Sequence, residues 1–402
     1  MDWTGIFASR IGVLKPSAIR AMAKHVGQPG VISFASGSPN AALFPVARIA
    51  EAIAEILADP TRAREALQYG PSEGYGPLRR LVGEMLSREG AAVPAEDVIV
   101  TSGSQQALEF VGKTFVDRGD RIVVTRPTYS GALQAFGLFE PEFIEVGVTA
   151  AGLDLDALDA AFAKAPKFFY LMPDHGNPSG SIIPLAQRHA VLRMARRYGV
   201  PVVEDQAYDQ LQLSGEALPT MLALDRETAS PDGAIVLYLG TVSKSLTPGL
   251  RVGWIVAPGA VHGKLVSVKQ ASDLNSGMLN QMAVERVARR IMADHGPVLR
   301  AGYRARRDAM LAALAAHMPE GVDWQDPDGG MFVWLTLPAG LDAETLQRTA
   351  FDEAKVIFVP GAAFHADGSG GNTLRLSYSL ADEAQIAEGV ERLAAVIARR
   401  TA

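Results

Sequence analysis

The sequence predicts an α/β protein: a large domain with a mainly parallel sheet sandwiched by helices, and a smaller, discontinuous α+β domain. Between residues 98 and 257, short apolar runs alternate with longer amphipathic patterns. The apolar runs lack inside–outside alternation, which is typical of strands that are covered on both faces. A long helical region then precedes a second, shorter group of strands and helices. Strand and helix in series favour parallel pairing, and the change of pattern indicates a second domain.

Six apolar runs are the expected strands of the large sheet: DVIVTSG, DRIVVTRP, KFFYLMPD, VPVVEDQ, AIVLYLG and RVGWIVAP. Helical patterns lie between several of them, for example LAQRHAVLRMARRYG, which ends on a glycine suited to a helix C-terminus. In open α/β sheets, ligands bind beyond the carboxyl ends of the strands. Polar residues that follow these runs are therefore the candidates for a binding site.

The smaller domain is expected from the last part of the chain. Residues 278–317 read as helical, followed by strands in GGMFVWLTL, KVIFVPG and TLRLSYS and a final helix near residues 383–400. The first 47 residues contain one helical and one strand pattern, too little to fold alone. We therefore expect an N-terminal arm (1–47) to pack on a small C-terminal domain (296–402), with a large domain (48–295) between them in sequence.

Composition excludes several classes of protein. The 402 residues carry a formal net charge of −6 and their basic residues are dispersed, so a nucleic-acid surface is not expected. There is no cysteine, hence no disulfide or thiolate site, and the histidines lack ligand spacing, so no metal is expected. No apolar run approaches the roughly 20 residues of a membrane helix, and the start lacks a signal-peptide pattern. A cytoplasmic protein without membrane partners is expected.

Polar residues follow four of the predicted strands. They are Ser102, Gly103, Ser104 and Gln105 after the first run, Asn177 after the third, Asp205 and Tyr208 after the fourth, and Thr241, Ser243, Lys244 and Arg251 after the fifth. The first group suits a phosphate at a helix N-terminus, although an ordinary helix cap explains it equally well. Asp205 ends an apolar strand, where an unpaired charge is costly, so it should have a cationic partner unless it caps a helix.

One ligand would use all of these groups. Its phosphate would bind to Ser104, Gln105, Thr241, Ser243 and Arg251. Its ring cation would pair with Asp205, its aldehyde would react with Lys244, and its phenolic oxygen would accept hydrogen bonds from Asn177 and Tyr208. Pyridoxal 5′-phosphate (PLP) has these four parts, and it requires a lysine Schiff base and an acidic partner for its pyridine nitrogen. PLP is therefore the expected cofactor.

The sequence also resembles a known family along nearly its whole length. The segments concerned are SFASGSPN, LQYGPSEGYGPLR, VTSGSQQAL, RPTYSGALQAF, NPSG, VVEDQAY, YLGTVSKSLTPGLRVG, GGMFVWL, FVPG and LRLSYS. In this order they resemble the fold-type-I PLP-dependent aminotransferases of class I/II, in particular the 2-aminoadipate/kynurenine aminotransferase group. The single segments are loose, but the ordered set is specific.

The resemblance implies a role for each cofactor residue. Lys244 would form the Schiff base and later move a proton between the substrate α-carbon and the cofactor. Asp205 would keep the pyridine nitrogen protonated, and Tyr129, in PTYSG, would stack on the ring unless it is a core aromatic. Asn177 and Tyr208 would hydrogen-bond the ring hydroxylate.

Substrate and subunit contacts are implied in the same way. Arg375, in LRLSYS, matches the position that grips the substrate α-carboxylate by a bidentate pair, and Gly37 and Asn177 would line the substrate site. Arg20, in SAIR, would meet the distal carboxylate of a long acidic substrate, or else lie on a solvated helix face. Tyr69, in LQYGP, matches a residue that reaches the phosphate of the neighbouring subunit.

The expected active unit is therefore a homodimer with shared active sites, and Asn275 and Ser276 are two further candidates for its interface. Three departures from the group pattern leave the substrate class open: His175-Gly176 before Asn177, Gln206 in EDQAY, and two serines around Gly37. These serines are Ser36 and Ser38.

The predicted function is transfer of an α-amino group from an L-amino acid to 2-oxoglutarate, with 2-aminoadipate, aromatic or aliphatic amino acids as donors. One alternative keeps the cofactor but changes the outcome, as in a lyase, decarboxylase or oxidase on the same scaffold. The other is the ligand-sensing module of a transcription regulator. That alternative needs a basic N-terminal DNA-binding segment, whereas the sequence begins almost directly at the expected small domain.

Overall fold

The computed structural model describes residues 1, 3–13, 27–229 and 233–401. Within them an eight-stranded sheet has the order β2 (Val98–Thr101), β9 (Gly253–Val256), β8 (Val236–Thr241), β7 (Val202–Gln206), β6 (Phe169–Leu171), β3 (Arg121–Arg126), β4 (Glu142–Thr149), β5 (Gly152–Leu153). All pairs from β8 to β4 are parallel, whereas β9 is antiparallel to both neighbours and β5 is antiparallel to β4. The prediction of a mainly parallel sheet is confirmed, and all six predicted strands are present.

Helices cover both faces of this sheet. The helices of this part of the chain are α2 (Val46–Ala58), α3 (Pro60–Ala66), α4 (Gly76–Arg88), α5 (Ser104–Phe115), α6 (Ser130–Gly137), α7 (Leu155–Phe162), α8 (Leu185–Tyr198), α9 (Met221–Thr228), α10 (Gly259–Ser272) and α11 (Met278–His317), of which α3 packs on α2 and α11. In β3, Ile122 and Val124 pack in one apolar core while Val123 packs in the other. A strand buried on both sides needs apolar residues at every position, which explains the missing alternation.

A second sheet lies near the C-terminal end of the chain. It has the antiparallel order β10 (Asp323–Trp324), β11 (Phe332–Thr336), β14 (Thr373–Ser377), β13 (Val359–Pro360), and it is accompanied by α12 (Ala343–Ala354) and α13 (Glu383–Thr401). Short 3-10 segments occupy Thr4–Ile6, Ser9–Val13, Ala41–Leu43, Ala95–Asp97, Asp209–Leu211 and Gly361–Phe364.

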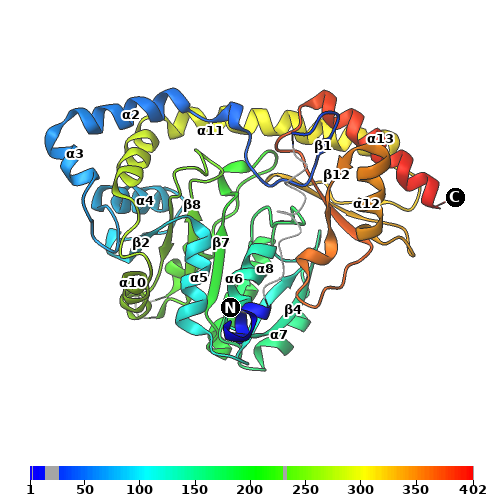
Figure 1. The fold of residues 1–402 in the computed structure, drawn as a ribbon. Coiled ribbons are helices and arrows are strands. Elements are labelled where there is room, and N and C mark those ends of the chain that lie inside the picture. The colour runs from blue at the N-terminus through cyan, green and yellow to red at the C-terminus, as the bar shows by residue number, and fades with distance from the viewer. Residues whose placement is uncertain (2, 14–26, 230–232, 402) are drawn as a thin grey trace.

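The N-terminal part of the chain lies against this second sheet. Strand β1 (Ile32–Ser33) pairs in parallel with β12 (Val356–Ile357), and the carbonyl of Phe34 accepts the N–H of Ser377 at 2.8 Å. The long helix α11 runs from beside α2 and α4 to beside α13 (Figure 1). The expected boundary between residues 295 and 296 falls inside this continuous helix, so the exact division into domains stays a prediction.

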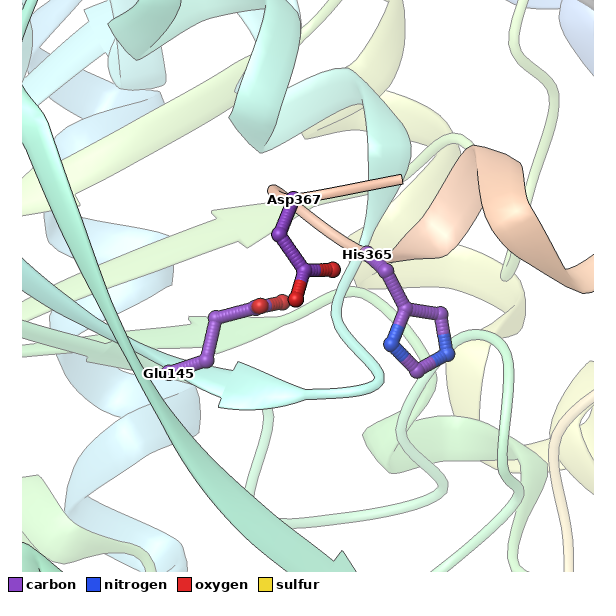
Figure 2. A group of neighbouring side chains, drawn as sticks. All are labelled: Glu145, His365 and Asp367. Carbon is purple, nitrogen blue, oxygen red and sulfur yellow. The ribbon is translucent and has the colours of Figure 1, made fainter. Parts of the chain in front are cut away.

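Side chains from β4 and from the loop before β14 meet at the junction of the two sheets. Glu145, His365 and Asp367 each offer one possible metal-ligand atom, all within 4.8 Å of one another (Figure 2). Glu145 also accepts the N–H of Ala366 at 2.9 Å, and Asp367 lies 3.7 Å from the Arg126 guanidinium. The contacts of Glu145 with Ala366 and of Arg126 with Asp367 connect the large sheet to the loop before β14, which explains why these side chains lie together.

None of the helices in the described part of the chain is both long and apolar enough to span a membrane.

Candidate active site

One cavity of about 370 Å³ collects most of the predicted site residues. Those that line it are Gly37, Ser104, Gln105, Tyr129, Asn177, Asp205, Tyr208, Thr241, Ser243, Lys244, Arg251 and Arg375. They come from the carboxyl ends of β7 and β8, the segments that follow β3 and β6, the segment before β9, the N-terminus of α5, the strand β14 and the N-terminal segment. The cavity therefore opens where the two sheets meet, beyond the ends of the parallel strands, as the position of ligands in open α/β sheets predicts.

The first end of the cavity is suited to an anion. Ser104 and Gln105 begin α5, where free backbone N–H groups and the helix dipole favour negative charge. Arg251 lies across this helix start and donates to the carbonyl of Ser102 at 3.0 Å. Gly103 adopts a φ of +84°, and a Cβ there would collide with the Arg251 guanidinium. Glycine at this position thus allows the guanidinium to approach the helix N-terminus.

Hydroxyl groups of the segment after β8 complete this end. Thr241 and Ser243 lie 2.8 Å apart through their Oγ atoms, and the Thr241 hydroxyl also donates to the carbonyl of Val252 at 3.0 Å. Both residues are buried and both line the cavity. Because the single proton of the Thr241 hydroxyl is donated to Val252, the Ser243 hydroxyl and the Arg251 guanidinium are the side-chain donors that these residues offer to a phosphate.

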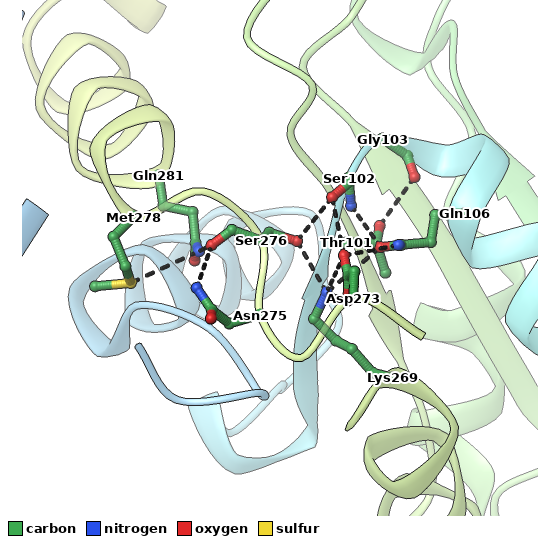
Figure 3. Close-up of polar contacts among 10 residues, drawn as sticks. All are labelled: Thr101, Ser102, Gly103, Gln106, Lys269, Asp273, Asn275, Ser276, Met278 and Gln281. Carbon is green, nitrogen blue, oxygen red and sulfur yellow. Dashed lines mark hydrogen bonds and ion pairs between the residues drawn. The ribbon is translucent and has the colours of Figure 1, made fainter. Parts of the chain in front are cut away.

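A buried polar network supports the anion end from behind (Figure 3). The Lys269 ammonium lies 2.9 Å from Asp273 Oδ1 and 2.9 Å from Ser276 Oγ. Asp273 Oδ2 in turn accepts from the Gln106 amide at 2.8 Å and from the Ser102 hydroxyl at 3.2 Å. Ser102 therefore turns its side chain into this network and away from the cavity, while its carbonyl holds Arg251.

Asp205 also lines the cavity, and its carboxylate lacks a full set of partners. It is 2% exposed, and its Oδ2 accepts from the Tyr170 hydroxyl at 2.8 Å. Its Oδ1 has no hydrogen-bond partner among the described residues. Burial raises the pKa of Asp205 to about 6, and the hydrogen bond from Tyr170 acts in the opposite direction. The cationic partner expected for Asp205 is not supplied by a described protein group.

Lys244 lines the same cavity. Its ammonium donates to the carbonyl of Gly37 at 2.9 Å and lies 6.0 Å from the centre of the Tyr208 ring. Burial, then the guanidinium groups of Arg375 and Arg251, lowers the pKa of Lys244 to about 8. Lys244 therefore loses its proton far more readily than an ordinary lysine, and only the neutral amine can act as a nucleophile.

Arg375 is a buried cation on the small-sheet side. It is 1% exposed, and it donates to Asn177 Oδ1 at 2.8 Å and to the carbonyl of Ala35 at 2.7 Å. Its guanidinium lies 4.1 Å from the centre of the Phe332 ring, and its Nε has no partner among the described residues. Burial lowers the pKa of Arg375 to about 10. The described residues offer it no carboxylate, so it remains available for one from a ligand.

Two aromatic residues flank the ring region. Tyr129 precedes α6, lines the cavity and lies 3.4 Å from the Gln105 amide oxygen through its hydroxyl. Tyr208 is buried and packs edge-on against Phe332, with ring centres 5.8 Å apart. Burial raises the pKa of Tyr208 far above its usual value, so its hydroxyl stays protonated and can donate.

Some predicted residues lie elsewhere. Ser102 and Gly103 do not line the cavity, and Tyr69 is 76% exposed. Ser276 is buried in the network around Lys269. Asn275 donates to the carbonyl of Ser276 at 3.0 Å. Arg20 lies outside the residues that the structure describes.

Two of the three departures from the group pattern lie behind the wall of the cavity. His175 is buried with its Nε2 2.9 Å from Gln212 Oε1, and it does not line the cavity. Gln206 donates to Asp174 at 2.6 Å and to Glu204 at 3.0 Å, also outside the cavity. Neither residue reaches the cavity in the single chain.

The third departure does belong to the cavity. Ser36 and Ser38 line it beside Gly37. The cavity also includes Met172, Ala207 and Pro248, which the sequence did not single out. Small and apolar side chains carry no chemical signature, so only their position next to Asp205 and Lys244 reveals them.

Comparison with known proteins decides the family. The family model for aminotransferase class I and II matches residues 29–393. The chain belongs to this family. It is 44% identical over 394 residues to 2-aminoadipate transaminase of Thermus thermophilus, with 98% of this chain and 96% of that protein covered. It is 39% identical over 405 residues to aromatic-amino-acid aminotransferase 1 of Thermococcus litoralis, with 99% and 95% covered.

A solved structure is similar over the whole length. Alpha-aminoadipate aminotransferase of Thermus thermophilus, complexed with N-(5′-phosphopyridoxyl)-L-leucine, has a TM-score of 0.92 and 43% identity, with 99% of both chains covered. The predicted resemblance to the fold-type-I aminotransferases is therefore confirmed. The protein is an aminotransferase, and its cofactor is PLP.

The residues of the cavity suit this cofactor. Asp205 Oδ1 is a buried acceptor without a donor among the described residues, and a protonated pyridine nitrogen would supply one. The start of α5 and Arg251 form a cradle for a phosphate. Lys244 lies in the same cavity with a lowered pKa. The fit thus rests on unsatisfied groups of this chain as well as on its family.

Proposed function

We propose that this aminotransferase moves the α-amino group of 2-aminoadipate, or of an aromatic or aliphatic L-amino acid, to 2-oxoglutarate, and that the residues of the cavity act as follows. Ser104, Gln105, Thr241, Ser243 and Arg251 hold the cofactor phosphate, and Asp205 faces the pyridine nitrogen. Tyr129 stacks on the ring, and Asn177 and Tyr208 bind the ring oxygen. The support is that all of these side chains line one cavity.

When bound, PLP supplies an electron-withdrawing ring that accepts the electron pair released at the substrate α-carbon. Lys244 Nζ holds the cofactor before the substrate arrives and then takes the α-proton. The lowered pKa of Lys244 supports this role, because only the neutral amine can accept a proton. The carboxylate of Asp205 lies in a buried site, where its charge stabilises a cationic ring more strongly than it would in water.

Arg375 carries the proposal that the substrate is an amino acid. Its guanidinium lines the cavity that contains Lys244, is fixed by Asn177 and Ala35, and has an Nε without a partner among the described residues. A guanidinium so fixed binds a carboxylate in a bidentate manner with little further loss of freedom. Holding the α-carboxylate there would direct the α-carbon toward Lys244.

The donor is proposed from the relatives, which are named for 2-aminoadipate and for aromatic amino acids. A panel of acidic, aromatic and aliphatic L-amino acids with 2-oxoglutarate tests it, with glutamate formation as the measurement. Lys244→Ala is the inactive control, and Arg20→Ala should lose acidic donors selectively if Arg20 meets their distal carboxylate. If the wild-type enzyme converts none of these donors, the proposed substrates are wrong.

We also propose a homodimer in which Tyr69 of one subunit reaches the cofactor phosphate of the other. The exposure of Tyr69 and of its neighbour Leu67, 76% and 73%, supports this proposal, because both side chains are accessible to a second subunit. Tyr69→Phe should weaken PLP binding, whereas Tyr198→Phe, which removes a hydroxyl bonded to Asp159 away from the cavity, should not. A monomer in light scattering at micromolar concentration would contradict this proposal.

A further inference from the structure

Asp205 has one contact that neither the family pattern nor the cavity lining assigns. The Tyr170 hydroxyl donates to its Oδ2 at 2.8 Å, and both groups are buried. Tyr170 itself is fully buried on β6 and does not line the cavity. Its ring packs edge-on against Phe136, with ring centres 5.6 Å apart. The hydroxyl therefore approaches the carboxylate from behind, out of reach of a ligand.

The register of the sheet produces this contact. Tyr170 lies opposite Val203 in the parallel pair of β6 and β7. Asp205 follows Val203 by two positions, so both side chains leave the same face of the sheet. A tyrosine is long enough to span the diagonal to the next residue on that face. A phenylalanine at this position would keep the packing but leave Oδ2 without its donor.

The contact fixes the direction of the carboxylate. With Oδ2 bound to Tyr170, the remaining oxygen is Oδ1, which has no partner among the described residues, and Asp205 borders the cavity. Without the tyrosine, the carboxylate could turn about its side-chain bond, because the described residues give it no other hydrogen bond.

The contact also favours the charged state of Asp205. Burial raises the pKa of this carboxyl to about 6, and the hydrogen bond from Tyr170 lowers it. Burial, followed by the charge of Asp205, raises the pKa of Tyr170 well above its ordinary value, so the hydroxyl remains a donor. A donor that cannot ionise stabilises the carboxylate at every pH at which the enzyme would work.

We propose that Tyr170 is a positioning residue for the reaction: it holds Asp205 by Oδ2 so that Oδ1 faces the pyridine nitrogen, and it keeps that carboxylate charged so that the ring nitrogen stays protonated. This inference rests on the proposed role of Asp205. Tyr170 touches neither substrate nor cofactor, and its effect passes entirely through the carboxylate.

The test uses the holoenzyme with PLP labelled with ¹⁵N at the ring nitrogen, because the ¹⁵N chemical shift reports directly on protonation. Tyr170→Phe removes one oxygen and keeps the ring that packs on Phe136. Tyr238→Phe is the matched control, since Tyr238 is a buried tyrosine on β8 that does not line the cavity. Tyr170→Met is the second variant if Tyr170→Phe does not fold.

In the wild-type enzyme the nitrogen should be protonated at pH 8. In Tyr170→Phe its resonance should move toward the unprotonated value, and kcat should fall by about tenfold with little change in KM, as expected for the loss of one hydrogen bond to a charged group. Tyr238→Phe should match the wild-type enzyme in both measurements.

Two results would overturn the inference, and they are distinguishable. A ring nitrogen protonated equally in wild type and Tyr170→Phe removes Tyr170 from the reaction, even if the variant melts at a lower temperature. A nitrogen that is unprotonated in the wild-type enzyme removes the proposed role of Asp205, and with it the inference.

Discussion

Replacing Asp205 by asparagine should stabilise the cofactor-free chain at alkaline pH, although it removes a proposed cofactor contact. Without PLP, the described residues give the buried carboxylate one donor, Tyr170, and no cation. Asparagine has nearly the same shape and can still accept from Tyr170 through its amide oxygen. The substitution removes the free-energy cost of burying a charged carboxylate. Functional sites often retain groups that lower the stability of the folded chain.

The size of the effect follows from the pKa of Asp205, which is raised from 3.8 to about 6 by burial. When a carboxyl group has a higher pKa in the folded state than in the unfolded state, the free energy of unfolding falls as the pH rises through the folded-state pKa. The reason is that the folded chain keeps its proton to a higher pH than the unfolded chain does. Relative to a pH at which Asp205 is protonated in both states, the free energy of unfolding is lower by about 3 kcal/mol at pH 8 and by about half of that at pH 5. The variant avoids this loss, so its advantage should grow between these two pH values.

Urea denaturation of the cofactor-free wild type and of Asp205→Asn, at pH 5 and pH 8, measures this advantage. Asp352→Asn, at an exposed position on α12, is the control and should show no comparable dependence on pH. The reasoning is refuted if the stability difference between Asp205→Asn and wild type is the same at both pH values, or if the variant is the less stable chain at pH 8.

Three further predictions concern ligand binding. Arg375→Lys should lower kcat/KM for amino acids by about tenfold to a hundredfold, because a bidentate contact is lost, whereas Arg306→Lys should have no effect. Lys269→Met should raise the dissociation constant of PLP by about tenfold, because Asp273 loses its buried cation. Lys113→Met is the control, because it removes an ion pair with Glu109 on the surface. The rate at which the cofactor-free chain binds PLP should rise by about tenfold per pH unit up to about pH 8, the pKa of Lys244; a rate independent of pH, followed by absorbance, would contradict this.

The sequence identifies the strands of the large sheet well because they are buried on both faces. It misses β4, Glu142–Thr149, whose residues are mostly half-buried or exposed and include two glutamates. The direction of β9 is also beyond the sequence pattern, since an apolar run looks the same whichever way it pairs. A strand that is buried on both faces can thus be recognised from its apolar residues, whereas the half-buried strand β4 and the direction of β9 cannot be recognised from the sequence.

For the site, the sequence finds the residues whose chemistry is unusual for their surroundings. Lys244 and Asp205 stand out because charged groups next to apolar strands need an explanation. Tyr170 reads as an ordinary core aromatic, and only the register of β6 against β7 brings its hydroxyl to Asp205. Ser102 shows the opposite case, since its side chain turns out to face Asp273 and not the cavity.

The long helix α11 links the two halves of the cavity mechanically. Its 40 residues extend for about 60 Å, with Val287 in the core on the α4 side and Met310 in the core that includes the second sheet. Arg375 lies on that second sheet, whereas Lys244 follows a strand of the first. A movement of the two sheets relative to each other would therefore bend or tilt α11, or slide it along one of the two cores. Pro297, where one helical hydrogen bond is missing, is the position at which this helix bends most easily.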